Sequence, residues 1–179
     1  MLVINNIINT LISCFLCIEN QSIFYIKNNI NQEVINTNSY QYLLSQKENY
    51  PLIYPEFFEL KNLLEKYQFT VIIANPPQRS TYGLLDIKTR TIWINPIVFD
   101  LGIALPTIIH EATHAAQLCS GKNEIRALNL PLSPPNISRP FFTHYNHGLR
   151  RHLEAEAYAV QTHPDGYNLV LSLLDQHCK

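Results

Sequence analysis

The sequence predicts an α+β domain in which a small antiparallel sheet packs against several helices. Three observations support this class: apolar residues recur at helical spacing in the second half, short β-branched runs lie in the middle, and proline-containing loops separate the elements. Because 179 residues is a usual length for one domain, we expect a single domain over 1–179. Residues 70–179 would form its core, and residues 1–69 an N-terminal helical cover.

The composition argues against several classes of protein. Hydrophobic residues make up 46% of the chain and charged residues 15%, which argues against disorder. The 13 Lys and Arg residues nearly balance the 14 Asp and Glu residues, so we expect no nucleic acid as a partner. No apolar run reaches about 18 residues, so we expect no transmembrane helix and no membrane partner.

The four cysteines do not form a metal-binding or disulfide pattern. Cys14 and Cys17 make one CxxC pair in an apolar, helix-periodic stretch, whereas Cys119 and Cys178 stand far away. We therefore expect free thiols in a reducing compartment. No Lys or Arg precedes Lys27, so the charged start of a secretory signal is missing and the predicted location is cytoplasmic.

The first third of the chain is expected to cover the rest. Residues 2–18 place isoleucines on one helical stripe, which indicates a helix packed on the domain. The alternative, a helix on a membrane surface, lacks the Lys and Arg that anionic lipids attract. Residues 19–50 are rich in Asn and Gln, with candidate strands at 22–27 and 33–37. A helix over 55–67 follows, and its initial proline suits a first turn.

Short strands are expected in the middle of the chain. The first, Thr70–Ala74, ends at prolines that cannot continue a ladder. Gly83–Asp86 and Arg90–Asn95 flank a turn near Lys88, and the second of them alternates apolar and polar residues. Antiparallel pairing follows from this arrangement.

Three helices are expected in the second half. The first runs from Pro106 to about Ser120, and Gly121 is placed to end it. After a long proline-containing loop, a second helix covers about 148–162, and a third covers about 167–177.

The first of these helices contains His110-Glu111-Ala112-Thr113-His114, which reads HExxH. Residues four apart lie one above the other on a helix, so both imidazoles can reach one metal ion. Glu111 is then not a ligand but lies beside the ion, where it can take a proton from metal-bound water. The alternative is two histidines that stand four apart by chance.

A zinc site needs at least a third protein ligand. The longer HExxHxxGxxH pattern is absent, because Gln117 and Ser120 stand where that pattern has Gly and His. The helix over 148–162 offers Glu154 and Glu156 among alanines, which allow close packing. Glu156 lies within the apolar stripe and Glu154 at its margin, so burial favours Glu156. The other acid would hold a His or an Arg, or pair with an arginine on the helix surface.

The two helical motifs resemble the gluzincin class of zinc metallopeptidases, in which HExxH is followed by a second helix reading Glu-x-x-Ala-(Asp/Asn). The chain is most similar to short soluble members such as the ImmA/IrrE-type proteases, over about residues 83–162. The resemblance implies that both motif histidines bind zinc, that Glu111 is the general base and that Glu154, rather than Glu156, is the third ligand. Tyr158 departs from the family, which often has an Asp or Asn there to support a ligating His.

A hydrolytic site also needs a group that stabilises the oxyanion formed when water adds to a carbonyl. Candidates are His144, Tyr145, His147 and Tyr158, and Arg139 could hold a substrate carboxylate. Three His and three Arg crowd the segment from 139 to 152, which favours a loop facing the site. Contact with nucleic acid is the alternative use of this basic segment.

The expected function is hydrolysis of peptide bonds through a zinc-bound water, with Glu111 as general base and Tyr145 and His147 as further catalytic candidates. Residues 70–179 would be the catalytic core. In the family, a strand before the first helix binds the substrate backbone, so a protein or peptide substrate would extend along the edge strand near Arg90–Asn95 and add its own backbone to the sheet. Two alternatives remain: a zincin-like protein that binds metal for regulation or interaction without turnover, and a structural module without metal.

Overall fold

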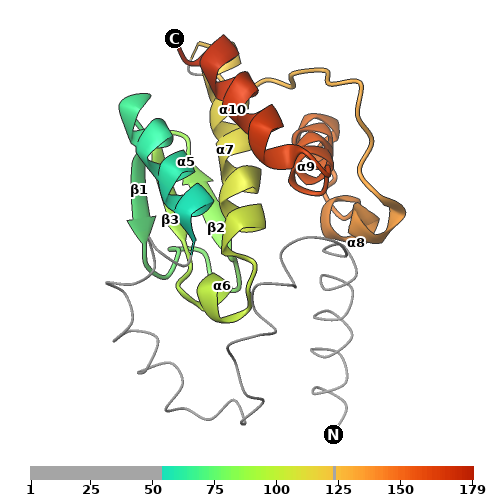
Figure 1. Cartoon of the computed structure of the whole chain (residues 1–179). Coiled ribbons are helices and arrows are strands. Elements are labelled where there is room, and N and C mark those ends of the chain that lie inside the picture. Colours follow the sequence, from blue (N-terminus) through green and yellow to red (C-terminus); the bar gives the residue numbers. More distant parts are fainter. Residues whose placement is uncertain (1–53, 123) are drawn as a thin grey trace, which may run out of the picture. The chain divides into compact units, whose positions relative to one another are not determined.

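The computed structural model describes residues 54–122 and 124–179, which form helices and a small sheet (Figure 1). The predicted α+β class is confirmed. The predictions for the helix over 2–18, the strands within 19–50 and the Cys14–Cys17 pair lie outside the described residues. The elements are α5 (Pro55–Lys66), β1 (Thr70–Ile73), β2 (Gly83–Asp86), β3 (Thr91–Ile94), α6 (Ile97–Asp100), α7 (Ala104–Ser120), the 3-10 helix η3 (Asn136–Ser138), α8 (Arg139–Phe142), α9 (Gly148–Gln161) and α10 (Gly166–His177).

The sheet is mixed rather than antiparallel, with strand order β1-β3-β2. β2 pairs with β3 in antiparallel register, with Gly83 opposite Ile94 and Asp86 opposite Thr91, as the turn between them predicts. β1 pairs with β3 in parallel, with Thr70 opposite Thr91, so the expected antiparallel sheet is wrong for this strand. The reason is that β3 inserts between the two earlier strands, and β2, which runs opposite to β1, returns the chain to the end of the sheet at which β1 begins.

The strand order also changes which strand can bind a substrate backbone. β3 pairs with a strand on each side, so the expectation that Arg90–Asn95 forms an edge is wrong. Within the described residues, β2 is an edge strand, and it contacts α7. Two large apolar side chains that flank it are exposed, Tyr82 by 45% and Ile87 by 40%.

α7 is the helix around which the described elements pack. It contacts α5, α6, α9 and α10 as well as strands β2 and β3 (Figure 1). Its sequence explains this position, because apolar residues face several sides and Ile108, Ala112 and Leu118 are fully buried. Burying a side chain such as leucine contributes about 1.5–3 kcal/mol. The core that holds α7 in place also includes the fully buried side chains of Phe57, Leu60, Leu64, Ile92, Ile94, Val160, Val170 and Leu174.

The observed helix bounds lie close to the predicted ones. α7 begins at Ala104, two residues before the predicted start at Pro106. Pro106 therefore lies in the first turn, where a missing N–H breaks no helical hydrogen bond. It ends before Gly121, where a Cβ would collide with the backbone carbonyl of Glu124. The short helices α6, η3 and α8 lie in stretches that the sequence pattern does not identify as helical. None of the helices in the described part of the chain is long and apolar enough to cross a membrane.

Cys119 and Cys178 form a disulfide, with their Cα atoms 5.1 Å apart. The bond joins the last turn of α7 to the residue after α10, and these two helices pack against each other. The expectation of free thiols is therefore wrong for this pair, since residues 59 apart meet only through helix packing. Disulfides are typical of oxidising compartments, so the cytoplasmic location stays a prediction that this bond does not support.

Removing the disulfide is expected to lower the free energy of unfolding. In the chain-entropy model, closing a loop of 59 residues is worth about 4 kcal/mol. Urea unfolding of the C119A/C178A variant should therefore show a loss of about 2–4 kcal/mol relative to the oxidised wild type. An unchanged free energy of unfolding, together with two reactive thiols at these positions in the wild type, would contradict the bond.

Candidate metal centre

Two histidines of α7 and one glutamate of α9 converge. His110 and His114 lie one turn apart on α7, and their Nε2 atoms are 3.2 Å apart. From α9, Oε2 of Glu154 lies 3.3 Å from Nε2 of His110 and 3.7 Å from Nε2 of His114. The three side chains are largely shielded, with exposed fractions of 12%, 11% and 17% respectively. We refer to these three residues as the metal-ligand cluster.

The spacing of the three atoms fits a tetrahedral metal ion. Zinc binds imidazole nitrogen at about 2.0–2.1 Å and carboxylate oxygen at about 2.0–2.2 Å, so ligand atoms around a tetrahedral ion lie about 3.3–3.5 Å apart. The observed separations of 3.2, 3.3 and 3.7 Å span this range. Within residues 54–122 and 124–179, this is the one group of three or more His, Cys, Asp or Glu residues that could hold an ion.

A glutamine lies behind each imidazole. Nδ1 of His110 is 2.9 Å from Oε1 of Gln161, and Nδ1 of His114 is 2.8 Å from Oε1 of Gln117. When Nδ1–H donates to an amide oxygen, the lone pair of the neutral ring is on Nε2, the atom that faces the cluster. The sequence motifs miss both glutamines, although helical spacing could have found them: Gln117 follows His114 by three residues, and Gln161 follows Glu154 by seven.

Glu111 lies beside the cluster, between α7 and β2, with an exposed fraction of 5%. Its carboxylate accepts a hydrogen bond from the backbone N–H of Leu85. It also packs against Gly83, where a Cβ would lie 2.5 Å from Oε1. Burial raises the pKa of Glu111, although the charges of His110 and His114 lower it. A carboxylate with a raised pKa is suited to taking and returning a proton.

The cluster favours a positive charge at its centre. Burial lowers the pKa of His114, but the nearby carboxylates of Glu154 and Glu111 outweigh burial and raise the pKa to about 9. Burial raises the pKa of Glu154, but the close approach of His110 and His114 outweighs burial and holds the pKa far below its usual range. A proton and a metal ion therefore compete for the same place.

Glu156 is buried but does not face the histidines. Its Oε2 accepts hydrogen bonds from the backbone N–H of Leu128 and from the amide of Gln117, both at 2.9 Å. Its Oε1 accepts the backbone N–H of Leu130 at 3.1 Å. Both oxygens are thus engaged by protein donors, so Glu156 is not placed to be a ligand. Glu156 lies in the apolar stripe of α9 because it anchors the loop before η3, and not because it binds a metal ion.

Tyr158 contacts the cluster. Its ring centroid lies 4.7 Å from that of His110, and two phenylalanines of α8 pack against it at 5.8 and 5.9 Å. Tyr158 follows Glu154 by one turn of α9, so both lie on the same face of this helix. Among the candidates for stabilising an oxyanion, it is therefore the one that the structure brings to the site. Arg139 begins α8 and is exposed.

Tyr145, a further catalytic candidate, is contacted by His144 and by two arginines. The ring of His144 lies 4.1 Å from it, the guanidinium carbon of Arg150 lies 4.1 Å above it, and Arg151 donates to its carbonyl oxygen at 3.1 Å. His147 is the exposed residue that precedes α9. Among the described residues, no hydrogen bond, ion pair or ring contact joins Tyr145 or His147 to the metal-ligand cluster. Three of the six basic residues from 139 to 152 thus contact Tyr145, and His152 lies 3.8 Å from Oε1 of Glu156.

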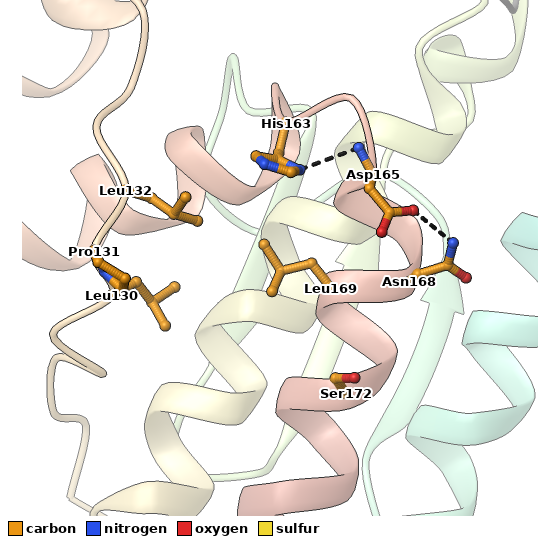
Figure 2. Close-up of a pocket in the computed structure, with 8 residues that line it drawn as sticks. All are labelled: Leu130, Pro131, Leu132, His163, Asp165, Asn168, Leu169 and Ser172. Atoms are coloured by element: carbon orange, nitrogen blue, oxygen red, sulfur yellow. Dashed lines mark hydrogen bonds between the residues drawn. The ribbon is translucent and has the colours of Figure 1, made fainter.

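A pocket of about 340 Å³ lies between the loop before η3 and α10 (Figure 2). Leu130, Pro131 and Leu132 line one side, and Leu169 of α10 lines the other. The residues of the metal-ligand cluster do not line it. The pocket is therefore separate from the candidate metal centre.

The raised pKa of His114 predicts how the stability of the metal-free protein depends on pH. A histidine with a folded pKa of about 9 and an ordinary value of 6.5 stabilises the fold fully below pH 6.5. This contribution, of the order of 3 kcal/mol, is lost as the pH rises to about 9. Chemical unfolding of protein stripped with a chelator, measured across this range, checks the prediction.

His114→Gln is the control for this measurement, because it removes the titrating ring and should flatten the decline. A metal-free wild type whose stability stays level or rises between pH 7 and pH 9 would contradict the assigned charge on His114.

Comparisons with known proteins do not place the chain in a family. No family model, no curated protein and no solved structure matches it. The candidate metal centre is therefore argued from the residues and geometry of this chain.

Proposed function

We propose that the chain is a small zinc-dependent metallopeptidase. The observation that carries the proposal is the convergence of two Nε2 atoms and one carboxylate oxygen, 3.2, 3.3 and 3.7 Å apart, from two separate helices. Two histidines and one glutamate are a ligand set of catalytic zinc sites, which keep a fourth position open. The HExxH spacing on α7 and the resemblance to gluzincins support the same assignment.

The residues around the ion would divide the work of hydrolysis. His110, His114 and Glu154 would hold the ion. Bound zinc supplies a Lewis acid that polarises the substrate carbonyl and lowers the pKa of water. Glu111 would take a proton from the attacking water and pass it to the leaving nitrogen, for which its raised pKa is suited. Tyr158, which contacts His110, would stabilise the developing oxyanion.

The edge of β2 would bind the substrate as an added strand. The carbonyl of Tyr82 accepts a hydrogen bond at 2.8 Å from the backbone N–H of Asn95, the residue after β3, so in the alternating antiparallel pattern the backbone groups of Gly83 and Leu85 face away from β3. The N–H of Leu85 already donates to Glu111, the proposed general base, so the N–H of Gly83 and the carbonyls of Gly83 and Leu85 would pair with the substrate. Exposed Tyr82 and Ile87 would contact apolar side chains of the substrate. The substrate would therefore be an extended, partly apolar peptide segment.

A second function has one observation in its favour. Glu111 is only 5% exposed, and its carboxylate is held by the N–H of Leu85. A zincin-like protein that binds zinc for regulation or interaction would need the same cluster but no mobile base. The two functions share the metal and differ in turnover.

Glu111→Gln separates these functions. The variant keeps all three ligands, so it should still bind one zinc ion per chain. Because it lacks the proton acceptor, cleavage of fluorogenic peptides should fall about 10²–10⁴-fold. Zinc is measured by mass spectrometry on protein purified without a chelator or a metal-affinity tag.

Glu154→Gln is the matched control, since it changes a ligand in the same way and should lose zinc as well as activity. A wild type that holds zinc but cleaves neither peptides nor unfolded proteins would contradict the peptidase function and support the metal-binding function.

Gly83→Ala tests the placement of Glu111 from the opposite side. The new Cβ would lie 2.5 Å from Oε1 and 2.7 Å from Cγ of Glu111, so this side chain must move. Because a displacement of about 1 Å can cost about 10²-fold in rate, cleavage should fall by that order while zinc binding is unchanged. Gly148→Ala is the control, because nothing lies within 4 Å of its added Cβ. Cleavage by G83A at the wild-type rate would show that Glu111 does not act from this position.

A further inference from the structure

The proposed chemistry does not use Glu156, a buried acid with an exposed fraction of 4%. Its contacts form a continuous path to the cluster. The backbone N–H groups of Leu128 and Leu130 donate to Glu156, Glu156 accepts the amide of Gln117, and Gln117 in turn lies 2.8 Å from Nδ1 of His114. This path links the loop before η3 with one ligand of the proposed zinc site.

The amide of Gln117 can bind in only one orientation. Its Nε2 donates to Oε2 of Glu156 at 2.9 Å and to the backbone carbonyl of Leu153 at 3.1 Å. The carbonyl can only accept, and both oxygens of Glu156 already accept backbone N–H groups, so neither partner offers a hydrogen. Turning the amide over would set oxygen against oxygen and break two buried hydrogen bonds.

The fixed amide decides where the ring of His114 carries its hydrogen. Oε1 of Gln117 can only accept, so Nδ1 of His114 must donate to it. The lone pair of the neutral ring is then on Nε2, which lies 3.7 Å from Glu154 in the cluster. A flipped amide would favour the opposite tautomer, whose Nε2–H cannot bind a metal ion.

We propose that Glu156 is a positioning residue of the metal centre, which acts through Gln117 to hold Nε2 of His114 available for the ion. The proposal rests on the metal site of the proposed function. Gln161, the partner of His110, has no second acid behind it among the described residues. Glu156 should therefore act on one histidine and not on the other.

A double-mutant cycle in the full chain tests this path. Zinc affinity is measured by competition with a chromophoric chelator for the wild type, Q117M, E156M and the double variant. Changes behind a ligating histidine cost about 10–100-fold in metal affinity, so each single variant should lose affinity by this order. In the Q117M background, E156M should add no further loss, because its effect passes through Gln117.

Two controls separate this path from general damage to the fold. Q161M removes the partner of His110 by an independent route, so its effect and that of E156M should multiply. E124Q changes an acid with a 78% exposed side chain that pairs with Arg126 in the same loop, and it should leave the affinity unchanged. If E156M does not fold, E156A, which likewise removes both acceptor oxygens, enters the cycle with the same expected result.

A readout without metal distinguishes this proposal from the proposed function. In ¹⁵N-labelled, metal-free protein, the Nδ1–H of His114 should give an NMR signal protected from exchange, and both Q117M and E156M should lose that protection. A wild type that shows this signal but binds no zinc would contradict the proposed peptidase function. The hydrogen-bonded path from Glu156 through Gln117 to His114 would still stand. A protected signal in E156M, or a loss of affinity by E156M that persists in full in the Q117M background, would overturn the role of Glu156.

Discussion

The close approach of α9 to α7 is the constraint on which the candidate site depends. Gln117 of α7 reaches the backbone carbonyl of Leu153 on α9 at 3.1 Å, which is a distance that bulky side chains between the helices would prevent. Ala157 of α9 is fully buried, and its side chain is a single methyl group. As a consequence, the carboxylate of Glu154 lies 3.3 Å from His110 instead of extending into water. Taking such groups out of water is unfavourable unless their charges are balanced.

The balance of charge explains why the same cluster suits both a proton and a divalent cation. Glu154 and Glu111 bring two carboxylates to one place, and both are largely shielded from solvent. A proton on His114 offsets only one of them, which agrees with the raised pKa of both His114 and Glu111. A divalent ion offsets both carboxylates at once and replaces the proton. Within the described residues, the edge of β2 meets this charged centre at Glu111, so an incoming backbone would lie beside the group that is proposed to move the proton.

Local sequence patterns predict much of this structure, but they do not predict features that depend on contacts between distant segments. Helical spacing identifies α7, α9 and the histidine pair, because the relevant residues lie within one or two turns. The parallel pairing of β1 and the Cys119–Cys178 bond depend on how separate elements pack. A helical wheel shows that Glu156 is buried but not that loop N–H groups bury it, so it could not separate Glu156 from Glu154. The basic residues from 139 to 152 suggest a site, whereas in the structure His144 and Arg150 contact the ring of Tyr145.

X-ray absorption at the zinc edge of the full chain tests the central claim most directly. The account predicts one zinc ion per chain, bound by four nitrogen or oxygen atoms at about 2.0–2.1 Å, with the multiple scattering of two imidazole rings. A sulfur atom at about 2.3 Å, or a shell without imidazole, would contradict it, because the ion would then be bound by residues other than His110, His114 and Glu154.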